Sequence, residues 1–252
     1  MTPSLTDPSR LVPLTGAYNF RDLGGYPTED GGQTAFGRLF RSDTLQELTA
    51  DDVVHVRDRL GVRTVVDLRA VGEVATEGRG PLEQEPLDYV NVPLLADVEE
   101  KDAVPVPIGT DLSAFYLHIL EDRGDKVADA LRVLGDTDRG PAVFHCAAGK
   151  DRTGLVAALV LRVAGVPDAA VVADYAATSA HMDKVVARFR RLSYARVVEE
   201  EPPEVFMAVG ATMQRFLDQL EERHGGARGW ARSAGVGDDV LDRLAAGLLD
   251  RP

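Results

Sequence analysis

One segment near the middle of the chain, Ala142–Val163, constrains the fold more than any other. It opens with a short, mostly apolar run, Ala142–His145, which is typical of a buried strand, and it closes with the apolar stretch Thr153–Val163, which is typical of a buried helix. Only the short loop Cys146–Arg152 joins the two. A strand that passes so directly into a buried helix indicates an α/β fold with a parallel sheet.

The chain before this segment also alternates between strand and helix patterns. Val62–Leu68 is apolar and β-branched and predicts a second buried strand, whereas Val127–Leu134 predicts a helix. Thr49–Asp52 has the pattern of a helix-capping box, and Gly61 suits the end of that helix. Residues 18–41 have the pattern of short strands broken by glycine turns. We therefore expect an α/β fold with a central, largely parallel sheet flanked by helices.

The last third of the chain is predicted to be helical. Apolar residues recur at helical spacing in two stretches, namely Met182, Val185, Val186, Phe189 and Leu192, and then Val205, Val209, Met213, Phe216, Leu217 and Leu220. The acidic, proline-broken stretch Glu199–Glu204 separates them. Neither helix alone buries enough to be a domain. We expect a single domain over residues 1–252, with a flexible segment at 1–15 and extra C-terminal helices, or a lid, at 180–252.

Composition narrows the function. The chain of 252 residues carries a net charge of −13, which argues against binding nucleic acid or an anionic membrane through bulk charge. A single cysteine, Cys146, excludes an internal disulfide, a Cys₄ zinc site and a CxxC redox pair. The other histidines, His55, His118, His181 and His224, show no metal-ligand spacing. We predict neither a metal nor another cofactor.

No export or membrane signal is visible in the sequence. The N-terminal residues contain several prolines and lack a basic start followed by an apolar run, which argues against a signal peptide. The longest apolar run, Leu155–Leu161, is far shorter than the roughly 20 residues that a membrane span needs. We expect a cytoplasmic protein without a membrane span, although secretion without a leader would leave the same sequence. The oligomeric state is left open.

The loop Cys146–Arg152, which follows the predicted strand Ala142–His145, combines three chemical features. Successive backbone N–H groups and the positive end of the helix can cradle an anion, and the residues that form this cradle are Ala147, Ala148, Gly149 and Lys150. Arg152 returns to the mouth of the loop, where its planar fork can bind two phosphate oxygens. A helix start and a neighbouring arginine favour the thiolate form of Cys146. An anion cradle, a cation and a soft nucleophile together suit attack on phosphorus through a thiophosphate intermediate.

The spacing Cys-x₅-Arg-Thr resembles the signature loop of the cysteine-dependent protein tyrosine phosphatases. The string HCAAGKDRTG is similar to a bacterial branch that includes secreted mycobacterial tyrosine phosphatases and listerial lipid-directed phosphatases. Further matches are Asn19–Gly25, Gly37–Ser42, Asp67–Arg69 with Glu73, and Asp174-Tyr175. Two departures are a 94–126 region that is shorter than the lid-bearing region of the mycobacterial enzymes, and Thr178 where the family tends to have serine. The resemblance implies a tyrosine phosphatase-like fold and a metal-independent hydrolase.

The resemblance assigns roles within the loop. Cys146 is the expected nucleophile, and Arg152 is expected to bind the phosphoryl oxygens. Thr153 is expected to hydrogen-bond the sulfur, or to serve as the helix N-cap, or both. Asp151 is the expected general acid, because a carboxyl beside a phosphate dianion holds its proton more readily. The alternative for Asp151 is an ionised carboxylate that the helix dipole stabilises.

Residues around the loop are expected to support it. Lys150 either meets a second phosphate of the substrate or is an exposed, solvated lysine. His145 is expected to orient the loop by hydrogen bonding. Asp67 and Arg69 follow the neighbouring strand at the edge where α/β sheets bind ligands, and Arg69 could pair with Glu73 one helical turn away.

The basic residues of the first C-terminal helix are Lys184, Arg188 and Arg191. They share a helical face, and we expect them to be solvated charge or part of a lid.

We predict a phosphomonoester hydrolase that acts on phosphotyrosine, with phosphoserine or phosphothreonine proteins and a phosphoinositide headgroup as further candidate substrates. The alternative is a pathway phosphatase for a sugar or nucleoside phosphate. A rhodanese-like sulfurtransferase is a more distant alternative, since it also uses a cysteine cradle. A nucleotide P-loop is excluded because Phe144 occupies the first glycine position of that motif.

Overall fold

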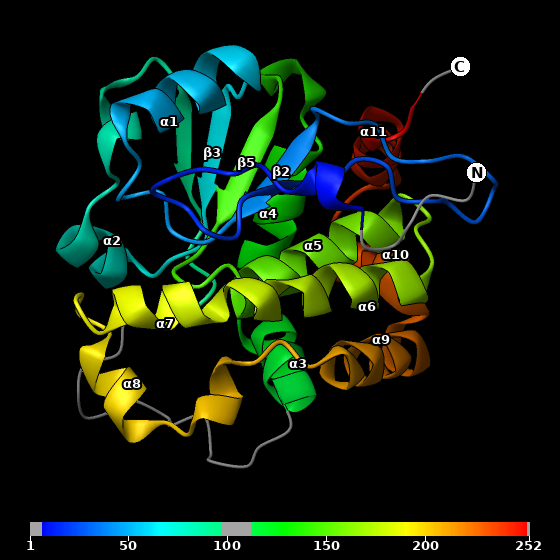
Figure 1. The fold of residues 1–252 in the computed structure, drawn as a ribbon. Coiled ribbons are helices and arrows are strands. Elements are labelled where there is room, and N and C mark those ends of the chain that lie inside the picture. Colours follow the sequence, from blue (N-terminus) through cyan, green and yellow to red (C-terminus); the bar gives the residue numbers. More distant parts are fainter. Residues whose placement is uncertain (1–6, 97–111, 251–252) are drawn as a thin grey trace.

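A five-stranded sheet forms the centre of the computed structural model, which describes residues 7–96 and 112–250. The strands are β1 (Arg21–Asp22), β2 (Leu39–Ser42), β3 (Thr64–Asp67), β4 (Asp88–Asn91) and β5 (Ala142–His145), in the spatial order β1-β2-β5-β3-β4. All neighbouring pairs are parallel except β1 with β2 (Figure 1). The central, largely parallel sheet is therefore confirmed.

Helices cover both faces of this sheet. They are α1 (Ala50–Val54), α2 (Val71–Glu77), α3 (Leu112–Asp122), α4 (Gly124–Leu134), α5 (Asp151–Val163), α6 (Asp168–Ala177), α7 (Met182–Phe189), α8 (Ala195–Glu200), α9 (Gly210–His224), α10 (Gly226–Ser233) and α11 (Asp238–Leu248). Figure 1 shows α5 and α6 side by side, with α7 below the sheet and α8 beyond it. None of the described helices is long and apolar enough to cross a membrane.

Alternating residues of the inner strands build two separate cores. Phe40, Val65 and Val143 point to one face, where they pack with α1 and the segment before β1. Their neighbours Val66 and Phe144 point to the other face, into a larger cluster formed with α3–α6 and α9–α11. Strands β3 and β5 are buried on both faces, which is why they form apolar runs in the sequence.

The parallel register brings three strand ends to one edge of the sheet. His145, the last residue of β5, lies opposite both Ser42 of β2 and Asp67 of β3. The residues that follow these strands therefore meet at the carboxyl edge, which is where open α/β sheets bind their ligands.

Two details differ from the expectations for the first half of the chain. The capping box is confirmed: the Asp52 N–H donates to the Thr49 hydroxyl (3.2 Å), and the Thr49 N–H donates to the Asp52 carboxylate (2.9 Å). The helix that it starts, however, changes into a π-helical turn over His55–Arg59 before Gly61. Strand β4 was not predicted, because it is a half-exposed edge strand without an apolar run.

Parts of both chain ends, residues 1–6 and 251–252, and the internal stretch 97–111 lie outside the described residues. Within the expected flexible segment 1–15, the described part is joined to the core by Arg10, which is buried and donates to the carbonyl oxygens of Gly24 (2.9 Å) and Gly25 (2.8 Å). Within the 94–126 region, which is shorter than the lid-bearing region of the mycobacterial enzymes, residues 97–111 lie outside the described residues.

The second apolar stretch of the C-terminal region does not form one helix. Val205 lies in a 3₁₀ turn, Pro203–Phe206, and Val209 precedes α9 with 51% of its surface exposed. The two prolines at 202 and 203 lack the N–H groups that a continuous helix would need. The helical prediction therefore holds from Gly210 onward and is wrong for Val205 and Val209.

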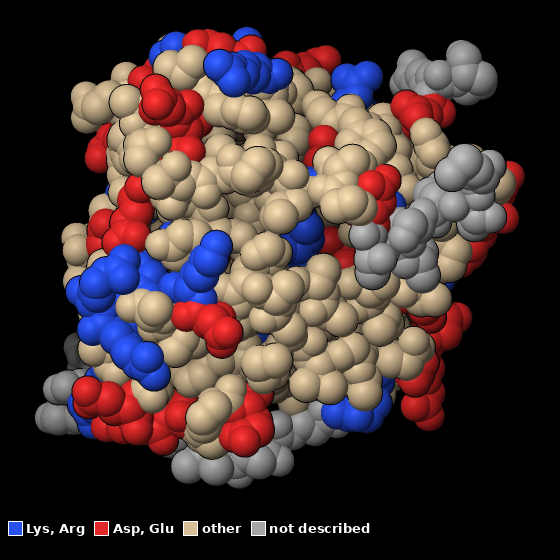
Figure 2. Space-filling view, viewed as in Figure 1, with Lys and Arg blue, Asp and Glu red and all other residues tan. Residues whose placement is uncertain are grey.

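Arg188 of α7 is buried, and the expectation of a solvated charge is wrong for this residue. Its guanidinium pairs with the buried Asp43 (Nη1–Oδ2, 3.0 Å) and with Glu47 (Nε–Oε2, 3.0 Å), and it donates to the carbonyl oxygen of Gly16 (2.8 Å). The exposed basic residues of this region are Lys184, Arg190 and Arg191, and Figure 2 shows basic side chains gathered over α7. A buried ion pair thus holds α7 against the sheet.

We predict that Arg188→Ala lowers the free energy of unfolding by about 3–5 kcal/mol, because it leaves the Asp43 carboxylate buried without its cation. Arg191→Ala is the matched control: Arg191 also contacts Glu47, but its side chain is 58% exposed, and we expect a loss of about 0.5 kcal/mol or less. Urea unfolding measures both. Equal losses in the two variants would contradict the structural role of the buried pair.

Candidate active site

The loop that follows β5 folds tightly against the end of β2. Gly149 has a φ of +66°, and a Cβ atom added there would lie 2.6 Å from the backbone nitrogen of Asp43 and from the carbonyl oxygen of Ser42. Only glycine fits a left-handed backbone at so close an approach. Cys146 lies at the base of the loop, almost fully buried, and α5 begins at Asp151. The sequence-predicted cradle therefore sits at the carboxyl edge of the sheet and at the start of a helix.

A buried ionic network holds the loop from below. The guanidinium of Arg41 donates to the Gly149 carbonyl oxygen (2.8 Å) and pairs with the buried Asp174. Asp174 also pairs with Arg21 (2.8 Å), and the amide of Asn19 donates to the Gly149 carbonyl oxygen (3.2 Å). Burial raises the pKa of Asp174, but Arg21 and Arg41 lower it more, to well below its usual range. The matched segments 19–25, 37–42 and 174–175 thus meet beneath the loop.

Glu73 holds the catalytic arginine candidate. Arg152 forms a two-point ion pair with the Glu73 carboxylate, in which Nη2 lies 3.0 Å from Oε1. The hydroxyl of Tyr194 donates to the same Oε1 (3.0 Å), and the backbone N–H of Ala70 donates to Oε2 (2.8 Å). Burial raises the pKa of Glu73, but Arg152 lowers it below its usual value. The possible Arg69–Glu73 pair is therefore wrong, since Glu73 pairs with Arg152 instead.

Arg69 pairs with Asp67 in a second buried cluster beside the loop. Its Nε lies 3.0 Å from Asp67 Oδ1, and the hydroxyl of Tyr89 donates to Oδ2 (2.9 Å). His145 lies 3.6 Å from Asp67 through Nε2 and 3.3 Å from the Cys146 carbonyl oxygen through Nδ1. Burial lowers the pKa of His145, and the Asp67 carboxylate opposes that shift. These contacts fit an orienting role for His145, Asp67 and Arg69.

Lys150 and Thr153 differ from their expected environments. Lys150 is only 2% exposed: its ammonium donates to the Val205 carbonyl oxygen and lies 3.2 Å from Asp151 Oδ1. The expectation of an exposed lysine is therefore wrong, because the chain after α8 covers it. Thr153 is the third residue of α5, so it is not the N-cap, which is Lys150. The buried hydroxyl of Thr153 has no hydrogen-bond partner among the described residues.

Asp151 is the partly open member of the site, with 28% of its side chain exposed. Its Oδ1 accepts a hydrogen bond from the hydroxyl of Tyr116 (2.8 Å), which in turn lies 2.6 Å from the hydroxyl of Tyr175. Sequence reasoning did not find Tyr116 or Tyr194, because neither belongs to a motif. Only the pair Asp174-Tyr175 gave a signal for this side of the site.

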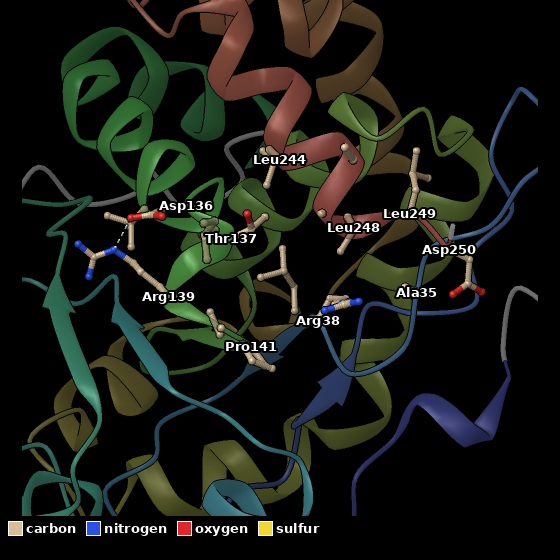
Figure 3. A pocket seen from close by; sticks show the side chains of 17 residues that line it. Ala35, Arg38, Asp136, Thr137, Arg139, Pro141, Leu244, Leu248, Leu249 and Asp250 are labelled. Atoms are coloured by element: carbon tan, nitrogen blue, oxygen red, sulfur yellow. Dashed lines mark hydrogen bonds and ion pairs between the residues drawn. The ribbon is translucent and has the colours of Figure 1, made fainter. Parts of the chain in front are cut away.

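A cavity elsewhere in the molecule is not part of this site. It has a volume of about 430 Å³ and lies between α11 and the amino ends of β2 and β5, lined by residues such as Arg38, Thr137 and Leu248 (Figure 3). Cys146 follows the opposite, carboxyl end of β5. Within residues 7–96 and 112–250, no group of three or more His, Cys, Asp or Glu residues is placed to hold a metal ion.

The chain belongs to the tyrosine phosphatase family, whose sequence profile matches residues 12–250. Members of this family are phosphoric monoester hydrolases, and the chain is one of them. It is 30% identical over 284 residues to the triple specificity protein phosphatase PtpB of Mycobacterium tuberculosis, with 94% of this chain and 98% of that protein covered. It is also 27% identical over 197 residues to a tyrosine-protein phosphatase of Nostoc commune, with 75% of this chain and 67% of that protein covered.

Among solved structures, the chain is similar to P. aeruginosa TpbA at 24% identity and a TM-score of 0.35, with 65% of this chain and 85% of that chain covered. The family match therefore rests on the sequence comparisons.

Because the Asp67 carboxylate is buried among its partners, we predict that its protonation in acid lowers the free energy of unfolding. Burial raises the pKa of Asp67, but His145 and Arg69 lower it more, from 3.8 to about 2. A carboxyl with a depressed pKa stabilises the fold above its unfolded value and loses this contribution as the pH falls from about 4 to about 2. Relative to Asp67→Asn, the wild type should lose about 2 kcal/mol of unfolding free energy over that interval.

The control for this measurement is Asp88→Asn, because the side chain of Asp88 is 63% exposed. Urea unfolding of the wild type and the two variants, at neutral pH and in acid, gives the six free energies. A difference in unfolding free energy between the wild type and Asp67→Asn that does not change with pH would contradict the predicted titration.

Proposed function

We propose that this tyrosine phosphatase family member hydrolyses phosphomonoesters through a covalent thiophosphate on Cys146. The observation that carries the proposal is the placement of Cys146 at the base of the loop after β5 and of Arg152 in the first turn of α5, at the carboxyl edge of the sheet. Arg41 and Asn19 hold the loop backbone through Gly149, and Glu73 holds Arg152. A site fixed in this way can bind a phosphoryl group without reorganising first.

In the first step, the Cys146 sulfur forms a bond to phosphorus while the bond from phosphorus to the leaving oxygen breaks. Arg152 and the backbone N–H groups of the loop neutralise the charge on the phosphoryl oxygens. Asp151 donates its proton to the leaving oxygen. Asp151 lies at the start of α5, immediately before Arg152, and its exposed side chain can reach the bound substrate.

In the second step, the Asp151 carboxylate takes a proton from a water molecule whose oxygen attacks phosphorus. The bond between sulfur and phosphorus breaks, which releases phosphate and restores the thiolate. The unpartnered hydroxyl of Thr153 is the group that would hydrogen-bond the departing sulfur.

We infer that the substrates are phosphotyrosine proteins, with phosphoserine, phosphothreonine and phosphoinositides as further candidates. The 30% identity to a triple specificity phosphatase over nearly the whole chain supports this wider range. For a second phosphate to reach Lys150, its ammonium must leave the Val205 carbonyl oxygen. A small sugar or nucleoside phosphate stays the alternative substrate, and a cytoplasmic location stays a prediction. Transfer of sulfur from thiosulfate would instead support the rhodanese alternative.

We predict that Cys146→Ser abolishes hydrolysis of nitrophenyl phosphate but leaves vanadate binding and the melting temperature unchanged, because serine is a far weaker nucleophile at neutral pH. Arg152→Ala should lose both hydrolysis and vanadate binding, since it removes the phosphoryl-binding fork. Arg139→Ala, at the opposite end of the sheet, is the control and should keep both. Steady-state kinetics and vanadate inhibition measure these effects. Normal turnover by Cys146→Ser would rule out the covalent mechanism.

We predict that Asp151→Asn slows the hydrolysis of phenyl phosphate by about 10²–10⁴-fold and that of nitrophenyl phosphate much less. Phenolate is the poorer leaving group and needs the proton, whereas nitrophenolate leaves without it. The comparison of kcat/KM for the two substrates is the measurement. An equal loss on both would assign the acid to another residue.

A further inference from the structure

Two buried tyrosines connect the interior of the protein to Asp151. Tyr116 of α3 and Tyr175 of α6 are both almost fully buried, and their hydroxyl oxygens lie 2.6 Å apart. The Tyr116 hydroxyl also lies 2.8 Å from Asp151 Oδ1. Among the residues of the site, Asp151 is the one that accepts a hydrogen bond from this tyrosine pair.

The number of hydroxyl hydrogen atoms fixes the direction of the hydrogen bonds that join Tyr175, Tyr116 and Asp151. A phenol carries one hydrogen, and Asp151 in its ionised form only accepts hydrogen bonds. If Tyr116 donates its hydrogen to Asp151, the short contact between the two hydroxyls requires Tyr175 to donate to Tyr116. Burial, Asp151 and Tyr175 all raise the pKa of Tyr116 well above its usual value, so Tyr116 keeps its hydrogen. The order of donation is therefore Tyr175 to Tyr116 to Asp151.

The two oxygens of the Asp151 carboxyl are not equivalent. Oδ1 faces both the Tyr116 hydroxyl and the Lys150 ammonium, which lies 3.2 Å away. Oδ2 has no hydrogen-bond or ion-pair partner among the described residues, and the side chain is partly exposed. A proton on the carboxyl is disfavoured at Oδ1, where two donors already point. It therefore belongs on Oδ2, the oxygen that is free to face a substrate.

We propose that Tyr116 is a positioning residue for Asp151: its hydroxyl fixes Oδ1, so that Oδ2 carries the proton toward the leaving oxygen. The inference rests on the proposed role of Asp151 as the general acid and deepens it. The bond persists in both protonation states, because Oδ1 accepts from Tyr116 whether it is a carboxylate oxygen or the carbonyl oxygen of the protonated acid. The acid thus keeps one orientation throughout the two steps.

The aromatic packing around Tyr116 makes this support rigid. Its ring meets the rings of Tyr175 and Phe216 edge to face, at centroid distances of 6.2 Å and 5.9 Å. Gly154 makes room for Tyr175: a Cβ added to Gly154 would lie 2.9 Å from Cδ2 of that ring. The glycine just after Arg152-Thr153 therefore allows the tyrosine pair to approach the start of α5. A group held by well-packed neighbours restricts its partner more than a mobile one does.

The test compares Tyr116→Phe with wild type on two substrates. We expect kcat/KM to fall about tenfold for phenyl phosphate and less than about twofold for nitrophenyl phosphate, with vanadate affinity unchanged. In the double variant Tyr116→Phe with Asp151→Asn, the hydrolysis of phenyl phosphate should be no slower than with Asp151→Asn alone, because the tyrosine acts only through that carboxyl. Tyr175→Phe, which keeps the bond from Tyr116 to Asp151, should give a smaller loss, again selective for phenyl phosphate.

Tyr26→Phe is the matched control. It removes a buried hydroxyl that also donates to a carboxylate (3.0 Å), but the carboxylate is that of Asp174 beneath the loop. Any loss in this variant should be equal for the two substrates. If Tyr116→Phe does not fold, as judged by its melting temperature, the substrate selectivity of Tyr175→Phe decides the matter.

The outcomes separate the two proposals. If Asp151→Asn lowers both substrates equally, the role of Asp151 as the acid is wrong. If Asp151→Asn is selective for phenyl phosphate while Tyr116→Phe has no effect, an equal effect on both substrates, or a loss that adds fully in the double variant, Asp151 is the acid and the positioning role of Tyr116 is overturned.

Discussion

The carboxylate of Asp174 connects the parts of the chain on which the loop after β5 depends. It lies buried between the guanidinium groups of Arg21 and Arg41, and Arg41 also donates a hydrogen bond to the carbonyl oxygen of Gly149. Separating one member of such a network would leave a charge buried without a partner, at a cost of several kcal/mol. The loop therefore owes its shape to β1, β2 and α6 as much as to its own residues.

The parts of this structure that sequence predicts are those set by local patterns. The strand Ala142–His145, the loop after it and α5 follow from apolar runs and from the spacing of Cys146, Gly149 and Arg152. Strand β3 was predicted for the same reason, because burial on both faces leaves a continuous apolar run. The half-exposed strand β4 leaves no such run and was missed.

The parts that sequence did not predict depend on contacts between distant residues. Nothing in the local pattern of α7 distinguishes Arg188, which is buried against Asp43, from the exposed Arg191. Glu73 follows Arg69 by four residues and was a plausible partner for it, but Arg69 precedes α2 and Glu73 pairs with Arg152 instead. Tyr116 likewise meets Asp151 only because α3 packs beside α5. These side chains lie outside the motif, and only the fold shows which residues they contact.

The proposed mechanism transfers the phosphoryl group through the sulfur of Cys146. It is tested most directly by mixing the protein rapidly with nitrophenyl phosphate, quenching in acid and locating the phosphoryl group by mass spectrometry of the digested protein. Asp151→Asn is the best variant for this experiment, because it should slow the attack of water more than the departure of nitrophenolate. We predict a phosphoryl group on Cys146 that disappears as turnover ends. A burst of nitrophenolate with the phosphoryl group on another residue, or on none, would contradict it.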